Sequence, residues 1–310
     1  MEKRRLGNSG LLVSEVGLGC NNFGQRLDAT GTRAVVDAAI DVGIDLFDTA
    51  DMYGSQLSEV YLGQALQGRR DEVIVATKCG YPMGEGPHNR GASRRYVISA
   101  VESSLRRLET DYIDLYQIHL PDALTPIDET LRALDDCVRQ GKIRYIGHSN
   151  FAGWQIADAH WTARRDRLNP FVTAQNHMSL LERDVLKEVI PACERFGLGM
   201  LPYFPLASGL LTGKYQRGVP APQGTRLSAP AAAARSLHDD NFDRVEKLDA
   251  FARARDRSLL ELAFGWLLSF PCVSSVIAGA TRPEQARANV EASTLRLSAD
   301  EMKEIDELLG

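Results

Sequence analysis

Four side chains that can move or steer a proton stand at the ends of apolar runs: Asp48, Tyr53, Lys78 and His119. A phenol such as Tyr53 has an ordinary pKa of about 10, so it donates a proton well only where its anion is stabilised. An ammonium such as Lys78 would lower that pKa, and a carboxylate such as Asp48 would hold the ammonium in place. His119 would orient a carbonyl oxygen toward Tyr53. Because no evident nucleophile accompanies them, we expect a bound nicotinamide to supply a hydride to the carbonyl carbon.

Hydrogen-bonding groups follow the later apolar runs in the same way. They include the segments GHSN (147–150), AQNH (174–177) and GATR (279–282), together with Tyr203. Taken singly, each group has an ordinary structural role in many proteins. Together they predict one polar rim that binds a ligand.

The elements that must position this rim are short apolar runs that alternate with stretches of helical spacing. We expect strands at Glu15–Gly19, Ile44–Phe47, Val73–Thr77, Ile113–Ile118, Ile143–Gly147, Val172–Ala174, Gly199–Tyr203 and Val276–Ala278. We expect helices at 31–42, 57–67, 93–107, 128–140, 153–164, 184–196, 241–254 with 258–269, 283–292 and 299–309. Continuous apolar strands separated by helices indicate a parallel sheet covered on both faces. Eight such units predict an α/β fold, a single (β/α)8 TIM barrel over residues 1–310, whose active site lies at the carboxyl ends of the strands.

An open, doubly wound sheet is the structural alternative. It needs a Gly-x-Gly-x-x-Gly turn after the first strand, whereas Gly17-Leu18-Gly19 is followed by Gly24 only after four other residues. Before that strand, KRRLGNSGLLVSEV predicts a β-hairpin that could plug the barrel floor. Residues 216–240, rich in Pro, Ala and Gly, predict an irregular segment that acts as a lid or binding loop, or else as a plain linker.

Composition limits the partners. The chain has 310 residues and a formal charge of −5, and its Lys and Arg residues form no stripe, so nucleic acid is not expected. No stretch reaches the length of a membrane span, and the first residues lack a signal-peptide core, so we expect a soluble, cytoplasmic protein. Five widely spaced cysteines indicate reduced core thiols instead of a disulfide framework or a zinc site.

The sequence resembles the aldo-keto reductase family over essentially the whole chain. The motifs that carry the resemblance are GIDLFDTADMYG, VIVATKCG, DYIDLYQIHLPD, KIRYIGHSN, AQNHMSLL, YFPLASGLLTGKY and VIAGATRPEQARANV. The resemblance implies a catalytic tetrad of Asp48, Tyr53, Lys78 and His119, with Tyr53 as general acid in the reduction of a small-molecule carbonyl substrate. The LASGLLTGKY turn is similar to the branch that includes bacterial general reductases and potassium-channel β subunits.

The resemblance also implies NADPH/NADP+ as the cofactor, with NADH as an alternative. The residues implied are Ser149, Asn150, Gln175, Tyr203, Phe204, Pro205, Leu206, Ala207, Gly209, Lys214, Arg226, Gly279, Thr281, Arg282, Gln285 and Asn289. The first three would hold the carboxamide, and Tyr203 would stack on the nicotinamide. The Phe204–Lys214 turn and the helix that starts near Arg282 would bind phosphates, with Lys214 and Arg226 as a latch. The family often has a glutamate where this chain has Ala288, so adenine recognition differs here.

Two other functions are compatible with parts of the pattern. A metal-dependent barrel hydrolase could use His119, His148 and His177, but the chain lacks a His-x-His pair after the first strand, and we expect no metal. A redox sensor that binds NADPH and regulates a partner would keep the same tetrad with slow turnover. The rim loops Cys20–Arg26, Tyr81–Arg90, Leu120–Asp122 and 216–240 would select the substrate. The sequence leaves the substrate and the oligomeric state open.

Overall fold

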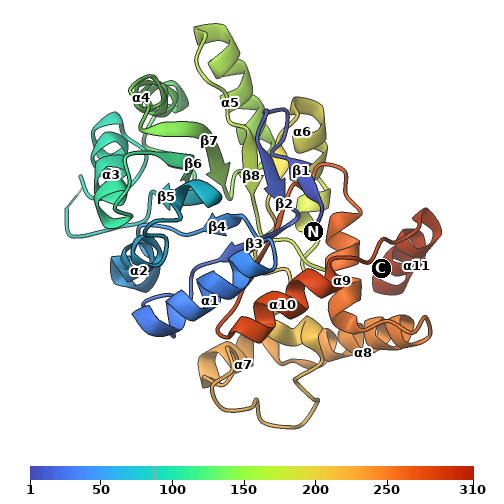
Figure 1. Cartoon of the computed structure of the whole chain (residues 1–310). Coiled ribbons are helices and arrows are strands. Elements are labelled where there is room, and N and C mark those ends of the chain that lie inside the picture. Colours follow the sequence, from blue (N-terminus) through green and yellow to red (C-terminus); the bar gives the residue numbers. More distant parts are fainter. Residues whose placement is uncertain (87) are drawn as a thin grey trace.

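Eight parallel strands form a barrel surrounded by helices in the computed structural model, which describes residues 1–86 and 88–310 (Figure 1). One residue of the expected rim loop Tyr81–Arg90, Pro87, therefore lies outside the described part. The strands adjoin in the order β10-β3-β4-β5-β6-β7-β8-β9. They span Val16–Gly19 (β3), Leu46–Asp48 (β4), Ile74–Cys79 (β5), Ile113–Ile118 (β6), Ile143–Ser149 (β7), Thr173–Gln175 (β8), Gly199–Met200 (β9) and Val276–Gly279 (β10). Each overlaps a predicted run, and the (β/α)8 prediction is confirmed.

The strand β9 is shorter than the sequence predicted. The expected strand reached Tyr203, but Pro202 has no N–H group to donate to a neighbouring strand. The chain nevertheless stays paired, since Ile277 N donates to Pro202 O at 2.9 Å. Together with a bridge between Met200 and Val273, this bond joins β9 to β10 and closes the barrel. The open-sheet alternative is therefore wrong.

The helices follow the predicted alternation. They span Ala29–Asp41 (α1), Leu57–Ala65 (α2), Arg94–Arg107 (α3), Ile127–Arg139 (α4), Gly153–Asp166 (α5), Val189–Phe196 (α6), Pro230–Ser236 (α7), Asp239–Arg253 (α8), Leu259–Leu268 (α9), Pro283–Ala292 (α10) and Ala299–Leu309 (α11). Several begin at a side-chain cap; the Ser93 hydroxyl, for example, accepts from the backbone N–H of Tyr96. None of the described helices combines the length and apolar character needed to cross a membrane.

Two predictions of secondary structure were wrong, one on where a helix starts and one on a segment expected to be irregular. The helix expected at 184–196 is a 3₁₀ turn at Asp184–Leu186 followed by α6, which starts at Val189. The segment 216–240, expected to be irregular, contains α7 and the start of α8. Its sequence PAAAARS has proline at the first helical position and then alanine, the strongest helix former, so local propensity explains the helix.

The N-terminal hairpin closes the floor of the barrel, as predicted. Strands β1 (Lys3–Arg5) and β2 (Leu12–Ser14) pair antiparallel, and Gly7 in their turn has a φ of +57°. Leu6 and Val13 are fully buried against a group of barrel residues that includes Leu46 and Ile74, the first residues of β4 and β5. The plug therefore sits at the amino ends of the strands, opposite the predicted catalytic rim.

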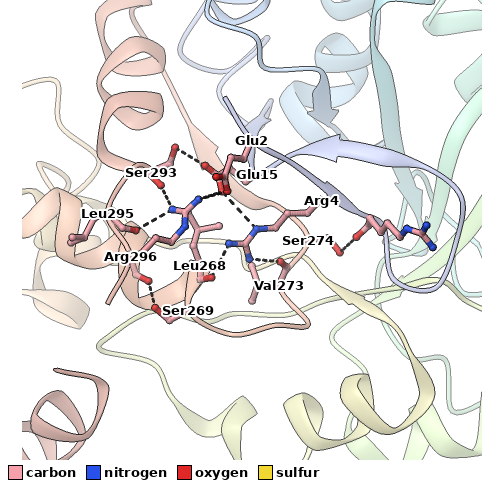
Figure 2. Close-up of polar contacts among 12 residues, drawn as sticks. Glu2, Arg4, Glu15, Leu268, Ser269, Val273, Ser274, Ser293, Leu295 and Arg296 are labelled. Atoms are coloured by element: carbon pink, nitrogen blue, oxygen red, sulfur yellow. Dashed lines mark hydrogen bonds and ion pairs between the residues drawn. The ribbon is translucent and has the colours of Figure 1, made fainter. Parts of the chain in front are cut away.

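A buried carboxylate fastens this floor to the C-terminal part of the chain (Figure 2). Glu15, which is 2% exposed, accepts from Arg296 at 2.6 Å, and Arg296 also pairs with Glu2 at 2.8 Å. Arg4 donates to the backbone oxygen of Leu268, the last residue of α9, at 2.9 Å. Burial raises the pKa of Glu15 more than Arg296 and Arg4 lower it. These contacts leave the opposite end of the barrel free to form a site.

Candidate active site

Asp48, Lys78 and His119 lie at the carboxyl ends of three neighbouring parallel strands, β4, β5 and β6. Such ends meet at one edge of the barrel. Lys78 Nζ donates to Asp48 Oδ2 at 2.7 Å and to the backbone oxygen of Thr49 at 2.7 Å. Burial acts to lower the pKa of Lys78, but Asp48 and Tyr53 outweigh it and the pKa stands above its ordinary value. Lys78 is therefore a buried ammonium held by a buried carboxylate.

Tyr53 reaches this pair from the turn after β4. The turn reverses sharply, because Gly54, Ser55 and Gln56 all have positive φ angles. A Cβ atom on Gly54 would lie 2.3 Å from the backbone oxygen of Phe23, so only glycine fits there. Lys78 Nζ lies 5.1 Å from the centre of the Tyr53 ring. Tyr53, Lys78 and Asp48 therefore lie together, and their catalytic roles stay a prediction.

The pKa of Tyr53 moves in the direction opposite to the sequence-based expectation. Burial raises this pKa, and Lys78 opposes the rise without cancelling it. The reason is that the loss of water destabilises the phenolate more than the charge of Lys78 stabilises it. Tyr53 is consequently a neutral phenol at neutral pH, the form that still carries a proton to donate.

His119 forms the opposite wall of the site. Its ring meets the Tyr53 ring edge-on at 5.7 Å between centroids and the Tyr81 ring edge-on at 4.7 Å. Burial, followed by the positive charge of Lys78, lowers the pKa of His119 to about 2. The ring is therefore neutral throughout the physiological range. A neutral imidazole can orient a carbonyl oxygen by a hydrogen bond without adding charge.

The second oxygen of Asp48 is held by amides that the sequence assigned otherwise or missed. Gln175, expected at a nicotinamide carboxamide, donates its Nε2 to Asp48 Oδ1 at 2.8 Å. Gln117 on β6 also approaches Asp48 Oδ1, at 3.4 Å. Sequence reasoning missed Gln117, although a glutamine inside the otherwise apolar β6 is a visible signal. These amides hold Asp48 Oδ1 in place while Asp48 Oδ2 accepts from Lys78.

Ser149, Asn150 and Tyr203 form a connected set beside His119. Asn150 Nδ2 donates to the backbone oxygen of His119 at 2.9 Å, and Asn150 Oδ1 accepts from the Tyr203 hydroxyl at 2.8 Å. The Ser149 hydroxyl donates to the backbone oxygen of Gln175 at 2.8 Å. The Tyr203 ring stacks on His177, with 10° between the ring planes and 5.4 Å between the centroids. These bonds fix the position of an aromatic face at the rim.

A cavity of about 950 Å³ opens at this end of the barrel, large enough for a cofactor-sized molecule. Its lining contains most of the residues predicted for catalysis and cofactor binding. Two are absent from it: Lys78, which is buried behind the wall, and Ala207. Asn21, Asn22 and Arg26 from the loop after β3 also line it. The sequence placed their loop, Cys20–Arg26, at the rim for substrate selection but assigned none of the three to the cofactor.

The turn after β9 has an unusual backbone. Phe204, Ala207 and Ser208 have φ angles of 52°, 45° and 59°, in a region that residues with a side chain rarely adopt. Gly209 follows with a φ of 96°, and a Cβ atom there would lie 2.5 Å from Lys214 Nζ. Such strain typically accumulates at ligand-binding sites. The turn that the sequence predicts to bind phosphates is thus strained and lines the cavity, and its binding role stays a prediction.

Four cationic side chains converge on the cavity from different rim loops: Arg26, Lys214, Arg226 and Arg282. Burial lowers the pKa of Lys214, and the charges of the three arginines lower it further. Among residues 1–86 and 88–310, none of the four has a carboxylate oxygen within 4.0 Å. Unpaired cations held close together favour a ligand with several negative charges. The donor set therefore fits the phosphates of a dinucleotide.

The segment 223–226 is fastened across this cavity. Arg26 donates to the backbone oxygen of Gly224, and Arg226 donates to the side-chain oxygens of Asn21 and Asn22 at 3.3 Å. The Arg226 guanidinium also lies 5.1 Å from the centre of the Phe204 ring. The part of the predicted lid that covers the site is therefore this short stretch and not the whole of 216–240.

The loop after β10 completes the rim. Gln285 accepts from the backbone N–H of Thr281 at 2.7 Å, which orders the entry to α10. Arg282 precedes that helix in an extended conformation, and Asn289 is buried about one turn beyond Gln285, on the same face of α10. The amino end of a helix favours anions through its free N–H groups and its dipole. Thr281, Arg282, Gln285 and Asn289, the residues predicted to bind the adenosine end of the cofactor and its phosphates, all line the cavity.

The histidines proposed for a metal site do not gather. His148 is fully buried and stacks on Phe151 at 4.5 Å, whereas His177 stacks on Tyr203. Within the described part of the chain, no group of three or more His, Cys, Asp or Glu side chains is placed to hold a metal ion. The geometry around the tetrad instead suits proton donation beside a bound organic cofactor.

Comparison with known proteins agrees with this geometry. A family model described as the aldo/keto reductase family matches residues 15–309. A probable voltage-gated potassium channel subunit beta from Oryza sativa subsp. japonica is 38% identical over 94% of this chain and 91% of its own length. The oxidoreductase YrpG of Bacillus subtilis is 37% identical over 99% of this chain and 96% of its own length. An L-glyceraldehyde 3-phosphate reductase from Escherichia coli is 34% identical, with coverages of 99% and 92%.

Proposed function

Because the chain belongs to the aldo/keto reductase family of oxidoreductases, we propose that it reduces aldehydes and ketones to alcohols with NADPH, and that Tyr53 is the general acid. The observation that carries the proposal is the buried Asp48–Lys78 pair beneath a neutral Tyr53, which faces His119 across the cavity. A bound NADPH would supply a hydride to the carbonyl carbon. The side chains of the tetrad would bind and orient the carbonyl group and deliver the proton.

The proton step follows from the charges. A carbonyl oxygen bound between Tyr53 and His119 gains negative charge as its carbon is reduced, and Tyr53 donates the phenolic proton to it. The resulting phenolate is stabilised by Lys78, which is already present as a preoriented cation. Asp48 keeps that cation charged, and Gln175 keeps Asp48 in place. Neutral His119 positions the oxygen by a hydrogen bond.

The cofactor would be held by the groups that line the cavity. Tyr203 offers its aromatic face to the nicotinamide ring, and Ser149 and Asn150 lie beside it. Lys214 and Arg226 would neutralise the pyrophosphate under the 223–226 segment. Arg282 is the candidate for a 2′-phosphate, which would favour NADPH over NADH.

The direct test is Tyr53→Phe, with Tyr61→Phe on α2, outside the cavity, as the matched control. We expect the wild type to oxidise NADPH in the presence of 4-nitrobenzaldehyde. Tyr53→Phe should lower kcat by about 10²- to 10⁴-fold, the usual contribution of a general acid, and should leave the affinity for NADPH unchanged. Tyr61→Phe should match the wild type. Full activity in Tyr53→Phe would refute the assignment.

Cofactor preference is tested by Arg282→Ala. Loss of a charge-assisted bond to a phosphate should weaken NADPH binding by about 10- to 100-fold and should leave NADH binding nearly unchanged. The measurement is the dissociation constant of each cofactor by fluorescence titration. An equal change for both cofactors would mean that Arg282 does not read the 2′-phosphate.

A redox sensor is the second candidate, and two observations favour it. The relative from Oryza sativa is named as a probable channel subunit, and the 223–226 segment is fastened over the cavity by hydrogen bonds to the loop after β3. A fastened cover would slow cofactor exchange and hence turnover. The two functions differ in one measurement: a fast single turnover followed by a much slower steady state supports a sensor, whereas similar rates support a reductase.

A further inference from the structure

Asp51 is a buried carboxylate that the proposed chemistry does not use. It lies two residues before Tyr53 in the turn after β4 and is 1% exposed. Its Oδ1 atom has no hydrogen-bond partner among the residues that the structure describes. A buried carboxyl group without full hydrogen bonding is costly in either protonation state, and most costly when ionised. The position therefore calls for a functional reason.

Tyr96 on α3 connects Asp51 to the wall of the active site. Its hydroxyl oxygen lies 3.4 Å from Asp51 Oδ2 and 3.3 Å from the backbone oxygen of Tyr81. Both partners are acceptors when Asp51 is ionised, but a tyrosine hydroxyl has only one hydrogen to donate. The two long, nearly equal distances are those of a hydroxyl shared between two acceptors.

Tyr81 in turn contacts a catalytic side chain. Its ring meets His119 edge-on at 4.7 Å, and it lines the cavity beside Tyr53. Tyr81 follows Gly80, which has a φ of 138°, a conformation that glycine adopts readily, so contacts made by Tyr81 itself help to fix its position. The hydrogen bond that its backbone oxygen accepts from the Tyr96 hydroxyl is one such contact.

We propose that Tyr96 is a positioning residue for Tyr81 and His119, and that a proton on Asp51 decides whether Tyr96 holds the Tyr81 carbonyl or turns to Asp51. When Asp51 is protonated, its own hydrogen can be donated to the Tyr96 oxygen, and the Tyr96 hydrogen is then free for the Tyr81 carbonyl. When Asp51 is ionised, Tyr96 donates to the carboxylate, and the Tyr81 carbonyl loses its donor. No covalent bond changes other than the O–H bond of Asp51.

The charges around Asp51 place this change near neutral pH. The groups that face it are Glu59 from α2, Arg107 and Tyr96 from α3, Cys79 from β5 and Tyr116 from β6. Burial, and then the charge of Glu59, raise the pKa of Asp51 to about 7, although Arg107 opposes the rise. Arg107 is largely occupied by Glu59, to which it is paired at 2.6 Å.

The consequence would be a pH-dependent affinity for the carbonyl substrate, and this step rests on the proposed reductase function. Ionisation of Asp51 should loosen Tyr81, so KM for the aldehyde should rise as the pH rises through about 7. The expected change is about two- to tenfold, which corresponds to one net neutral hydrogen bond. His119 and Tyr53 cannot produce this step, because their pKa values lie far below and above it.

The experiment compares pH profiles of KM for 4-nitrobenzaldehyde at saturating NADPH in three variants. Asp51→Asn carries a permanent amide donor, so its KM should stay at the low-pH value of the wild type. Tyr96→Phe removes the bridge, so its KM should stay at the high-pH value. Tyr116→Phe removes a fully buried hydroxyl of the same neighbourhood that bonds to neither Asp51 nor Tyr81, and it should retain the wild-type step.

A second readout needs no turnover and separates this proposal from the proposed function. In protein labelled with ¹³C-histidine, the His119 ring signals, assigned with His119→Gln, should shift with an apparent pKa of about 7 as the Tyr81 ring moves. The shift should vanish in Asp51→Asn and in Tyr96→Phe. The proposal would be overturned if the pH-dependent shift of the His119 signals, or the pH step in KM, persisted in Asp51→Asn or Tyr96→Phe. It would also be overturned if both were lost in Tyr116→Phe. If the protein reduced no aldehyde but the His119 signals still shifted with an apparent pKa of about 7, only the reductase function would be refuted.

Discussion

The buried pair of Asp48 and Lys78 should behave as one energetic unit. Lys78 is 0% exposed and Asp48 Oδ2 lies 2.7 Å from its ammonium, so at an effective dielectric constant of about 20 their attraction is about 6 kcal/mol. The loss of solvation of both charges offsets much of this. Removal of one partner leaves the other buried and unpaired, which typically costs about 3–5 kcal/mol.

The two single variants should differ in a definite order. Asp48→Asn leaves the Lys78 ammonium with the Thr49 carbonyl as its remaining partner, so we expect a loss near 5 kcal/mol, about the upper end of that range. Lys78→Met leaves an Asp48 that still accepts from Gln175 and Gln117, so we expect about 3 kcal/mol. The double variant Asp48→Asn/Lys78→Met contains no unpaired charge. It should be no less stable than Asp48→Asn alone.

The assay is urea unfolding followed by the fluorescence of the buried Trp266, with the free energy of unfolding compared across the four proteins. A coupling energy of about 3 kcal/mol or more is expected from the double-mutant cycle. If the two single losses add in the double variant, the pair is not a unit, and the proposed stabilisation of a Tyr53 phenolate by a fixed Lys78 loses its basis.

Two further predictions concern the backbone and acid stability. Gly54→Ala should lower kcat/KM by about 100-fold, because its Cβ would lie 2.3 Å from Phe23 O and displace Tyr53. The control Gly68→Ala changes a glycine that also has a positive φ but has no atom within 4 Å and lies outside the cavity, so it should keep full activity and lose about 1 kcal/mol of stability. Equal activities of the two variants would contradict the steric argument. Burial lowers the pKa of His148 from 6.5 to about 3, so the unfolded chain binds a proton more readily than the folded protein between these pH values. The free energy of unfolding should therefore decrease by roughly 4 kcal/mol as the pH falls from above 6.5 to 3, as measured by urea titration at each pH. His148→Phe should lack this fall, and an unchanged acid profile would show that His148 is not its source.

Much of the fold was predictable because the barrel repeats one simple pattern. Each strand is a short apolar run bounded by turn residues, and burial on both faces makes that run continuous. The strand β9 departs from the pattern at Pro202, where a missing N–H group matters more than hydropathy. The helix α7 was missed because an alanine-rich segment beside prolines and glycines has two interpretations, and only the observed helix distinguishes them.

The sequence predicted which residues meet at the site better than it predicted the hydrogen bonds between them. Asp48, Lys78 and His119 are expected to meet because parallel strands end at the same edge. That Gln175 bonds to Asp48 depends on side-chain directions across four strands of the barrel, which sequence spacing does not encode. The loop that contains Arg26 was predicted to lie at the rim, but Arg26 was not grouped with the other cations, because it becomes a neighbour of Lys214 only when two distant loops meet over the cavity.

The sequence by itself determined the alternation of strands and helices, the residue types at the rim and the family resemblance, since all of these depend on local order along the chain. Tertiary structure alone decided the direction in which the pKa of Tyr53 moves, the convergence of four cations that meet no carboxylate in the described part of the chain, and the shared hydroxyl of Tyr96. The physical reason is that desolvation and Coulomb interactions depend on distances and on excluded water. Those quantities exist only once segments far apart in the chain have packed together.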